Sequence, residues 1–166
     1  DIKKLLWNVN KIEIFSESLK NEKILNFQND NKTLFSIIRN YDLYNCLYLN
    51  LNRNKLIKFK KKTDYDYLRK SNYQLIFNCD YSHSISKKFF FKKIDKSYDS
   101  VAYIATIKHS KISNNTASQT FTKKGPLAFL PTSSTETSVV YSVKGNQNIN
   151  FEEAIRSFNS KYKISK

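Results

Sequence analysis

The stretch that decides the fold is residues 100–143, SVAYIATIKHSKISNNTASQTFTKKGPLAFLPTSSTETSVVYSV. Four segments in it are rich in apolar and β-branched residues, and three of these alternate with polar residues: 101–107, 117–122, 126–131 and 137–143. The segments are separated by HSKISNN, KKG and TSSTE, which are turn sequences. This pattern predicts an antiparallel sheet with one protected face, on which six apolar side chains lie: Val101, Tyr103, Leu127, Phe129, Val139 and Tyr141.

The flanking segments add a hairpin and a helix to this sheet. Residues 10–16 and 22–28 alternate apolar and polar side chains on either side of SLKN, which is typical of a hairpin. Residues 150–163 predict a helix, because their apolar residues recur on one helical face. Asn150 with Glu153 is a capping-box-like start for that helix.

Between the hairpin and the sheet, the pattern is that of a βαβ-like piece over residues 34–79. Its first strand is the apolar run 34–38, and its last is 73–79 (YQLIFNC), a continuous apolar run typical of a strand covered on both faces, with Asp80 at its carboxyl end. Asn40 opens the helix between them. The apolar stripe of that helix is Leu43, Cys46, Leu47 and Leu51. The sequence therefore predicts an α+β protein with two kinds of sheet interleaved along the chain.

Length and composition exclude several classes of protein. The chain has 166 residues, enough for one domain with a core or for part of a larger one. Its two glycines, Gly125 and Gly145, exclude a glycine-rich phosphate or dinucleotide loop within these residues. No run approaches the ~18 consecutive apolar residues of a membrane-spanning helix. Because the chain begins at Asp1 and contains no Met, we expect a segment of a longer polypeptide.

The formal net charge of +15 has two explanations. Lysine supplies 25 of the 29 basic residues and arginine only 4, although arginine is the better residue for bidentate contacts to phosphate or guanine. Lys, Asn and Ile share codons rich in adenine and thymine, so we favour codon bias as the source of the charge. The alternative is a basic binding surface made by the lysine runs at 58–62, 87–93 and 161–166.

No group of residues is spaced as a catalytic dyad or a metal site. Cys46 and Cys79 are not at ligand spacing to His83 or His109, so both cysteines are expected as small buried apolar side chains. His109 sits at a strand end without an obvious acidic partner and is expected at the surface. The sequence predicts no catalytic residue and no metal ligand.

Part of the deciding stretch resembles a known family. Residues 108–143 resemble the middle region of the ubiquinone-biosynthesis flavin hydroxylases, which belong to the para-hydroxybenzoate hydroxylase-like FAD monooxygenases. That family carries the pattern A…F…GPLA-x-LP…S-x-V. The positions that match it here are Ala117, Phe121, GPLA at 125–128, Leu130, Pro131, Ser138 and Val140.

Two further segments match the family in the order that it requires. IIRNYDLYNCL resembles a short strand followed by a polar residue, here Asn40, and the spaced leucines of a helix. FNCDYSHSISKK resembles the family motif D-G-x-x-S-x-x-R, with Asp80, Ser84 and Lys87 at its Asp, Ser and Arg positions and Tyr81 in place of its glycine. The resemblance implies that Asn40, Asp80 and Ser84 contact the cofactor.

The resemblance also implies an architecture. Residues 10–28 and 100–143 would form a substrate-side sheet, interleaved with part of an FAD-binding lobe at 33–90 and followed by the helix at 150–163. The family's N-terminal glycine-rich unit and C-terminal Gly-Asp motif are not present in these residues. This fragment of the para-hydroxybenzoate hydroxylase-like fold is therefore expected to be incomplete and inactive alone.

The activity that the resemblance implies is hydroxylation of an aromatic, prenylated ubiquinone precursor by a parent protein that uses FAD and NAD(P)H. The cofactor does the oxygen chemistry, and the protein supplies orientation and a dry site. Leu127, Phe129 and Pro131 are the candidate substrate-side wall, with an ordinary core strand as the alternative. The expected location is the cytoplasm, with peripheral association at the inner membrane as a further option, and nucleic acid is not favoured as a partner. The alternative function is a basic module that binds RNA or an anionic membrane surface.

Overall fold

The computed structural model describes residues 1–29, 32–60, 65–89, 92, 94–145 and 147–165. The chain divides into two compact units. The sheet unit consists of Asp1–Tyr48 and Tyr98–Lys166, and the inserted unit is Leu49–Ser97. Each unit is described by itself.

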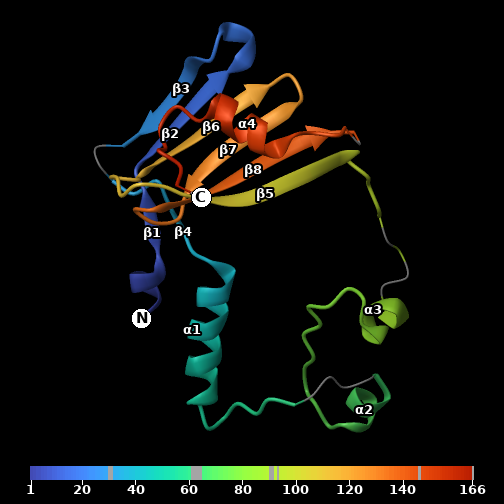
Figure 1. Ribbon diagram of the computed structural model, residues 1–166. Coiled ribbons are helices and arrows are strands. Elements are labelled where there is room, and N and C mark those ends of the chain that lie inside the picture. Colours follow the sequence, from blue (N-terminus) through green and yellow to red (C-terminus); the bar gives the residue numbers. More distant parts are fainter. Residues whose placement is uncertain (30–31, 61–64, 90–91, 93, 146, 166) are drawn as a thin grey trace. The chain divides into compact units, whose positions relative to one another are not determined.

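The sheet unit is built on six strands: β2 (Lys11–Ser16), β3 (Glu22–Gln28), β5 (Ser100–Lys108), β6 (Thr116–Thr122), β7 (Gly125–Pro131) and β8 (Glu136–Lys144). They form one sheet in the order β3-β2-β6-β7-β8-β5 (Figure 1). Neighbouring strands are antiparallel except β2 and β6, which are parallel. The predicted hairpin and the four predicted strands of the deciding stretch are confirmed. The parallel pairing that joins the hairpin to the other four strands is a feature that the sequence pattern did not reveal.

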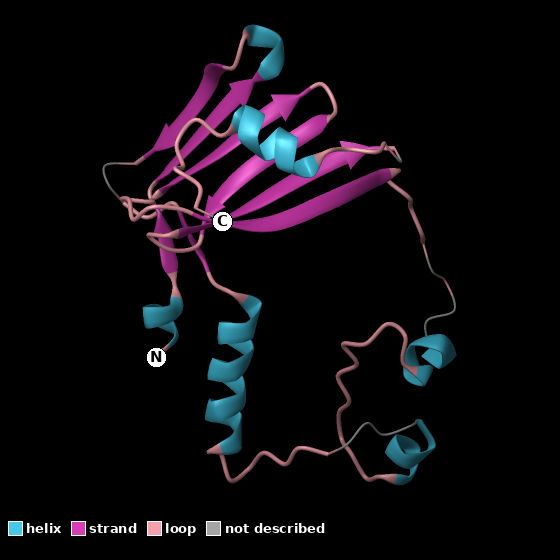
Figure 2. Cartoon of the chain, in the orientation of Figure 1, coloured by secondary structure: helices cyan, strands magenta, loops and turns pink. Residues whose placement is uncertain are grey.

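One face of this sheet is covered by helix α4 (Phe151–Phe158) and holds the core (Figure 2). The core side chains from the strands include Leu127, Phe129, Val139 and Tyr141, and Ile155 packs on them from the helix. Leu127 has no exposed surface. Burial of these side chains provides the main hydrophobic stabilisation of the sheet unit.

The pairing register shows that the predicted protected face is a single face. Leu127, Tyr141 and Tyr103 are partners in one row across β7, β8 and β5, and Phe129 pairs with Val139 in the next row. Side chains in such rows lie on the same side of a sheet. The prediction is confirmed, although Val101 near the end of β5 is 42% exposed.

Helix α4 begins as predicted and ends earlier than predicted. The Asn150 side chain accepts a hydrogen bond from the Glu153 backbone N–H at 3.1 Å, which caps the first turn. The helix ends at Phe158 rather than extending to residue 163, because the Asn159 side chain bonds the Tyr162 backbone instead. That local bonding turns the chain so that the Tyr162 ring enters the core.

Gly125, in the GPLA motif, is required by the backbone at the start of β7. Its φ is +142°, and a Cβ at this position would lie 2.0 Å from the Ser142 carbonyl oxygen. Any other residue would clash with the neighbouring strand. Packing of β7 against β8 therefore explains this glycine.

A second, two-stranded sheet pairs β1 (Trp7–Val9) antiparallel with β4 (Phe35–Ile37). The short helix η1 (Ile2–Leu5) precedes β1, and the short helix η2 (Glu17–Leu19) lies between β2 and β3. The predicted strand at 34–38 is thus present. Its partner is β1, however, so the predicted βαβ-like piece is not formed. Helix α1 (Asn40–Asn52) begins at Asn40 as predicted, but none of its residues is buried.

The inserted unit differs from the prediction. Its described residues form the end of α1 and two short helices, α2 (Tyr65–Lys70) and α3 (Ser84–Phe89), with no strand. The run 73–79 was predicted as a buried strand, and this is wrong: Phe77 is 84% exposed and Cys79 is exposed. A buried strand needs paired strands at its edges and layers on both faces, and the described residues of this unit provide no strand to pair with it.

Candidate functional site

The face of the six-stranded sheet opposite α4 is the largest candidate surface. Because side chains alternate along a strand, the neighbours of the core residues point to this side, which we call the open face. Between the two ends of the strands, its members are Leu25, Phe27, Ile12, Ile14, Ala117, Gln119, Phe121, Pro126, Ala128, Leu130, Ser138, Val140, Ser142, Ala102, Ile104 and Thr106. No charged residue occurs in this set, which lies wholly within the described part of the chain.

The middle of the open face is a continuous row across all six strands. In strand order, the partners are Leu25, Ile14, Gln119, Ala128, Val140 and Ile104. Most members are half-buried by their neighbours, and Ile104 on the edge strand is 70% exposed. Contiguous exposed apolar surface of this kind marks a binding or docking surface in soluble proteins.

Charged side chains of the same strands lie at the ends of the open face or on the other face. Lys108 pairs with Glu136 at one end, and Lys144 and Glu22 are at the other. On the face of β2 that points away from the open face, Glu13 accepts from Lys11 at 2.8 Å and from Lys23 at 2.6 Å. Burial acts to raise the pKa of Glu13, but the two lysines outweigh it and the pKa lies below its ordinary value.

The three predicted substrate-side residues lie on the covered face. Leu127, Phe129 and Pro131 are all buried in the sheet unit. They therefore belong to an ordinary core strand, which was the alternative interpretation of this segment. The residues of the same strand on the open face are Pro126, Ala128 and Leu130. Alternation in the sequence separates these two sets, but it does not say which set a helix covers.

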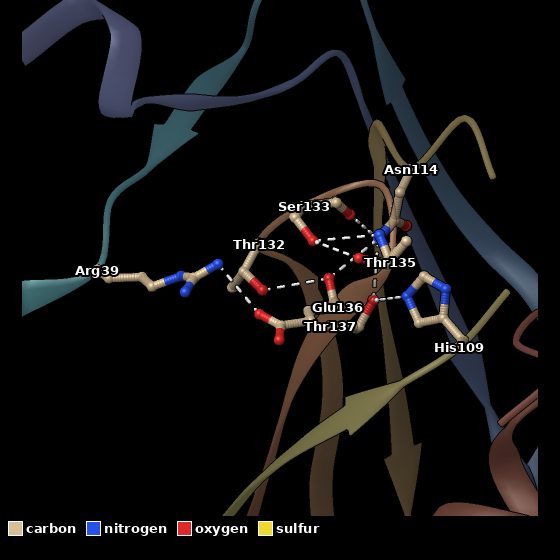
Figure 3. Close-up of polar contacts among 8 residues, drawn as sticks. All are labelled: Arg39, His109, Asn114, Thr132, Ser133, Thr135, Glu136 and Thr137. Atoms are coloured by element: carbon tan, nitrogen blue, oxygen red, sulfur yellow. Dashed lines mark hydrogen bonds and ion pairs between the residues drawn. The ribbon is translucent and has the colours of Figure 1, made fainter. Parts of the chain in front are cut away.

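Asn40, a predicted cofactor contact, lies beside one end of the open face. The preceding residue, Arg39, forms an ion pair with Glu136 at 3.0 Å between guanidinium and carboxylate (Figure 3). Glu136 begins β8 and lies on the open-face side of that strand. The start of α1 is thereby tied to the rim of the open face.

The other two predicted cofactor contacts share a loop in the inserted unit. The Asp80 carboxylate accepts from the Ser82 backbone N–H at 2.9 Å and from the Ser82 hydroxyl at 2.7 Å, which is an Asx-turn. Ser86 donates to the Asp80 carbonyl oxygen at 2.9 Å, and Ser84 is the first residue of α3. Asp80 therefore shapes the loop that leads to Ser84.

Tyr81 fits this loop without strain. It is not among the residues with positive φ, so the tyrosine in place of the family's glycine has an ordinary backbone conformation. Its ring is exposed and lines a groove of about 620 Å³. The other lining residues are Asn78, Cys79, Ser82, Ser86, Lys87 and Lys92.

These residues do not form an FAD pocket by themselves. A dinucleotide pocket brings a glycine-rich turn against the pyrophosphate, whereas Gly125 is committed to packing in β7 and Gly145 follows β8. The groove beside Asp80 has hydroxyl groups and two lysines in its lining, which could hydrogen-bond a polar ligand. The described residues therefore do not form a complete dinucleotide site.

A buried polar cluster closes the end of the sheet near β8 (Figure 3). Asn114 Nδ2 donates to the Ser133 carbonyl at 2.8 Å and to Thr137 Oγ1 at 3.0 Å, and Asn114 Oδ1 accepts from the Tyr162 hydroxyl at 3.1 Å. Burial raises the pKa of that phenol, although its hydrogen bond to Thr137 acts in the opposite direction. The cluster joins segments far apart in the sequence.

His109 belongs to this cluster and was wrongly predicted at the surface, since only 4% of it is exposed. Its Nδ1 lies 2.9 Å from the Ser110 carbonyl oxygen, which can only accept, so Nδ1 carries a proton. Its Nε2 lies 3.0 Å from Thr137 Oγ1, which also accepts from Asn114. Both ring nitrogens of His109 therefore have hydrogen-bond partners within the protein, which is a structural role.

The described residues contain no group of three or more His, Cys, Asp or Glu side chains that could hold a metal ion. In the same part of the chain, no helix is both long and apolar enough to cross a membrane. Compared with known proteins, the chain matches no family model, and no curated protein matches it.

Proposed function

We propose that this chain forms the substrate-side part of an FAD-dependent monooxygenase that hydroxylates the ring of a prenylated ubiquinone precursor. In this proposal the six-stranded sheet has the para-hydroxybenzoate hydroxylase-like arrangement, and the open face is the wall against which the substrate lies. The observation that carries the proposal is the absence of charge from the middle of the open face, between its charged ends, in a protein with a net charge of +15.

The chemistry of the open face fits a neutral, largely hydrocarbon ligand. A prenylated ring buries apolar surface against side chains such as Ala128, Leu130 and Val140, and it needs no charged partner there. A charged ligand would instead require a countercharge, because removing its hydration is costly. The resemblance of β6, β7 and β8 to the flavin hydroxylases supports the same class of substrate.

The flavin, when bound and reduced by NAD(P)H, supplies the oxygen chemistry. This chain's part is to orient the aromatic ring and to exclude water from one side of it. Asn40 lies next to the rim of the open face and is the cofactor contact that we assign in the sheet unit. Within the inserted unit, the resemblance assigns this role to Asp80 and Ser84. Polypeptide outside these 166 residues would hold most of the flavin. A prenylated substrate would also favour peripheral association with the inner membrane.

The test uses the intact gene product, purified and assayed for flavin absorbance and for NAD(P)H oxidation with and without 2-prenylphenol. We expect bound FAD and oxidation stimulated by the phenol. Val140→Lys, which places a charge in the open face, should abolish the stimulation and leave the flavin content unchanged. Asn148→Lys adds the same charge at an exposed position before α4 and serves as the matched control.

The alternative of a basic binding module predicts a different result. A gene product without flavin that is retained on heparin and released by salt would contradict the monooxygenase proposal and support an anionic partner. The 166-residue chain alone should be colourless after desalting. Stoichiometric flavin on it would contradict the expectation that most of the cofactor site lies outside these residues.

A further inference from the structure

Gln119 is the one amide side chain on the open face, and it lies in the middle row. Its partners on the neighbouring strands are Ile14 and Ala128. The same row continues through Leu25, Val140 and Ile104, which are all apolar. Gln119 is therefore a single polar group with an apolar neighbour on each adjoining strand.

Its own strand places an aromatic ring beside it. Ala117 and Phe121 are the neighbours of Gln119 on the same side of β6. Ala117 is 3% exposed, whereas Phe121 is 46% exposed. The surface next to the amide thus offers an accessible phenyl ring on one side.

Two amides with a structural role in the sheet unit, Asn114 and Asn159, are fully bonded, whereas the Gln119 side chain is not. Asn114 uses both its Nδ2 and its Oδ1 in the buried cluster, and Asn159 uses both ends of its amide on the Tyr162 backbone. Gln119 makes no side-chain hydrogen bond to any residue that the structure describes, and it is only half-exposed to solvent. Its donor and its acceptor are both available to a ligand.

We infer that Gln119 binds the neutral oxygen substituent of the aromatic ligand and so sets which edge of the ring lies over the wall. The inference rests on the proposed function and adds a specificity-determining residue to it. An amide both donates and accepts, which matches a phenol or a quinone oxygen, whereas a carboxylate would need a cation. Phe121 is placed to stack on the ring while the amide fixes its rotation.

The experiment measures binding to the 166-residue chain by NMR titration with two probes, 2-prenylphenol and prenylbenzene, which differ only in the hydroxyl group. The wild-type chain should bind the phenol about three- to tenfold more tightly, the effect of one neutral hydrogen bond. Gln119→Leu should bind both probes equally. Ser138→Ala removes a hydroxyl from the same face outside the middle row and should keep the preference.

The outcomes separate this inference from the proposed function. If both probes shift the open face equally in the wild-type chain, or if Gln119→Leu keeps the preference for the phenol, the role of Gln119 is refuted while the wall stands. If neither probe shifts any signal of the open face, the wall and the role of Gln119 both fail. Heteronuclear spectra of each variant show whether the sheet is folded.

Discussion

The two faces of the six-stranded sheet are made by alternate residues of the same strands, yet they differ in what covers them. One face carries Leu127, Phe129 and Tyr141 under α4, and the other carries Ala128, Leu130 and Val140, over which no described residues of the sheet unit form a covering helix (Figure 2). Folding of the sheet unit explains the apolar character of the covered face. It does not explain why the middle of the open face is also free of charge, and the proposed ligand would account for it.

The largest expected effect is on the covered face. Leu127→Ala leaves a cavity in a fully buried site and should lower the free energy of unfolding by about 2–5 kcal/mol. Leu130→Ala, on the open face of the same strand, should lower it by only about 1 kcal/mol or less. Denaturant titrations followed by circular dichroism measure both values. Equal losses would show that the open face is packed as tightly as the covered one.

The second comparison is between two amides. Asn114→Ala removes the acceptor of the Tyr162 hydroxyl and a donor to Thr137, and should cost about 1–3 kcal/mol of stability. Gln119→Ala should change the free energy of unfolding by no more than about 0.5 kcal/mol, because Gln119 bonds no described residue. A large loss from Gln119→Ala would assign that amide to folding rather than to binding.

The smallest effect concerns pH. The pKa of Glu13 is lowered in the folded state, so its ion pairs stabilise the fold above the ordinary carboxyl pKa, and this contribution is lost as the pH falls through the folded-state value. These pairs are partly exposed, so the effect should be below about 1 kcal/mol. Unfolding of wild type and Glu13→Gln should differ at neutral pH and converge in acid. A difference that does not change with pH would contradict this role of the Glu13 carboxylate.

The sequence predicts the sheet well where the signal is local. Alternation and turn residues locate the strands of residues 100–143, and Asn150 locates the start of α4. The run 73–79 misleads, because a continuous apolar stretch resembles a buried strand whether or not another strand is present to pair with it. Cys79, which was predicted to be buried at the end of that strand, is exposed because the strand is not formed.

The candidate site is less predictable than the fold. Alternation assigns Leu127 and Ala128 to opposite faces, but only the position of α4 shows that Ala128 is the one on the open side. His109 and Asn114 meet Tyr162 through contacts that are distant in sequence, so no local pattern reveals their cluster. The signal available in the sequence for the open face is that its positions between the ends of β6, β7 and β8 lack charge, which is unusual in a lysine-rich chain.

The measurement that tests the central claim most directly compares neighbouring residues on opposite faces of the sheet. In a methyl-labelled chain titrated with 2-prenylphenol, the account predicts shifts of the Ala128, Val140 and Ile104 methyl signals and none of Leu127 and Val139. Asn148→Lys should give the same pattern, and Val140→Lys should abolish it. Shifts on the covered face, shifts confined to the inserted unit, or no shift at all would contradict the account that the open face is a wall for a neutral aromatic ligand.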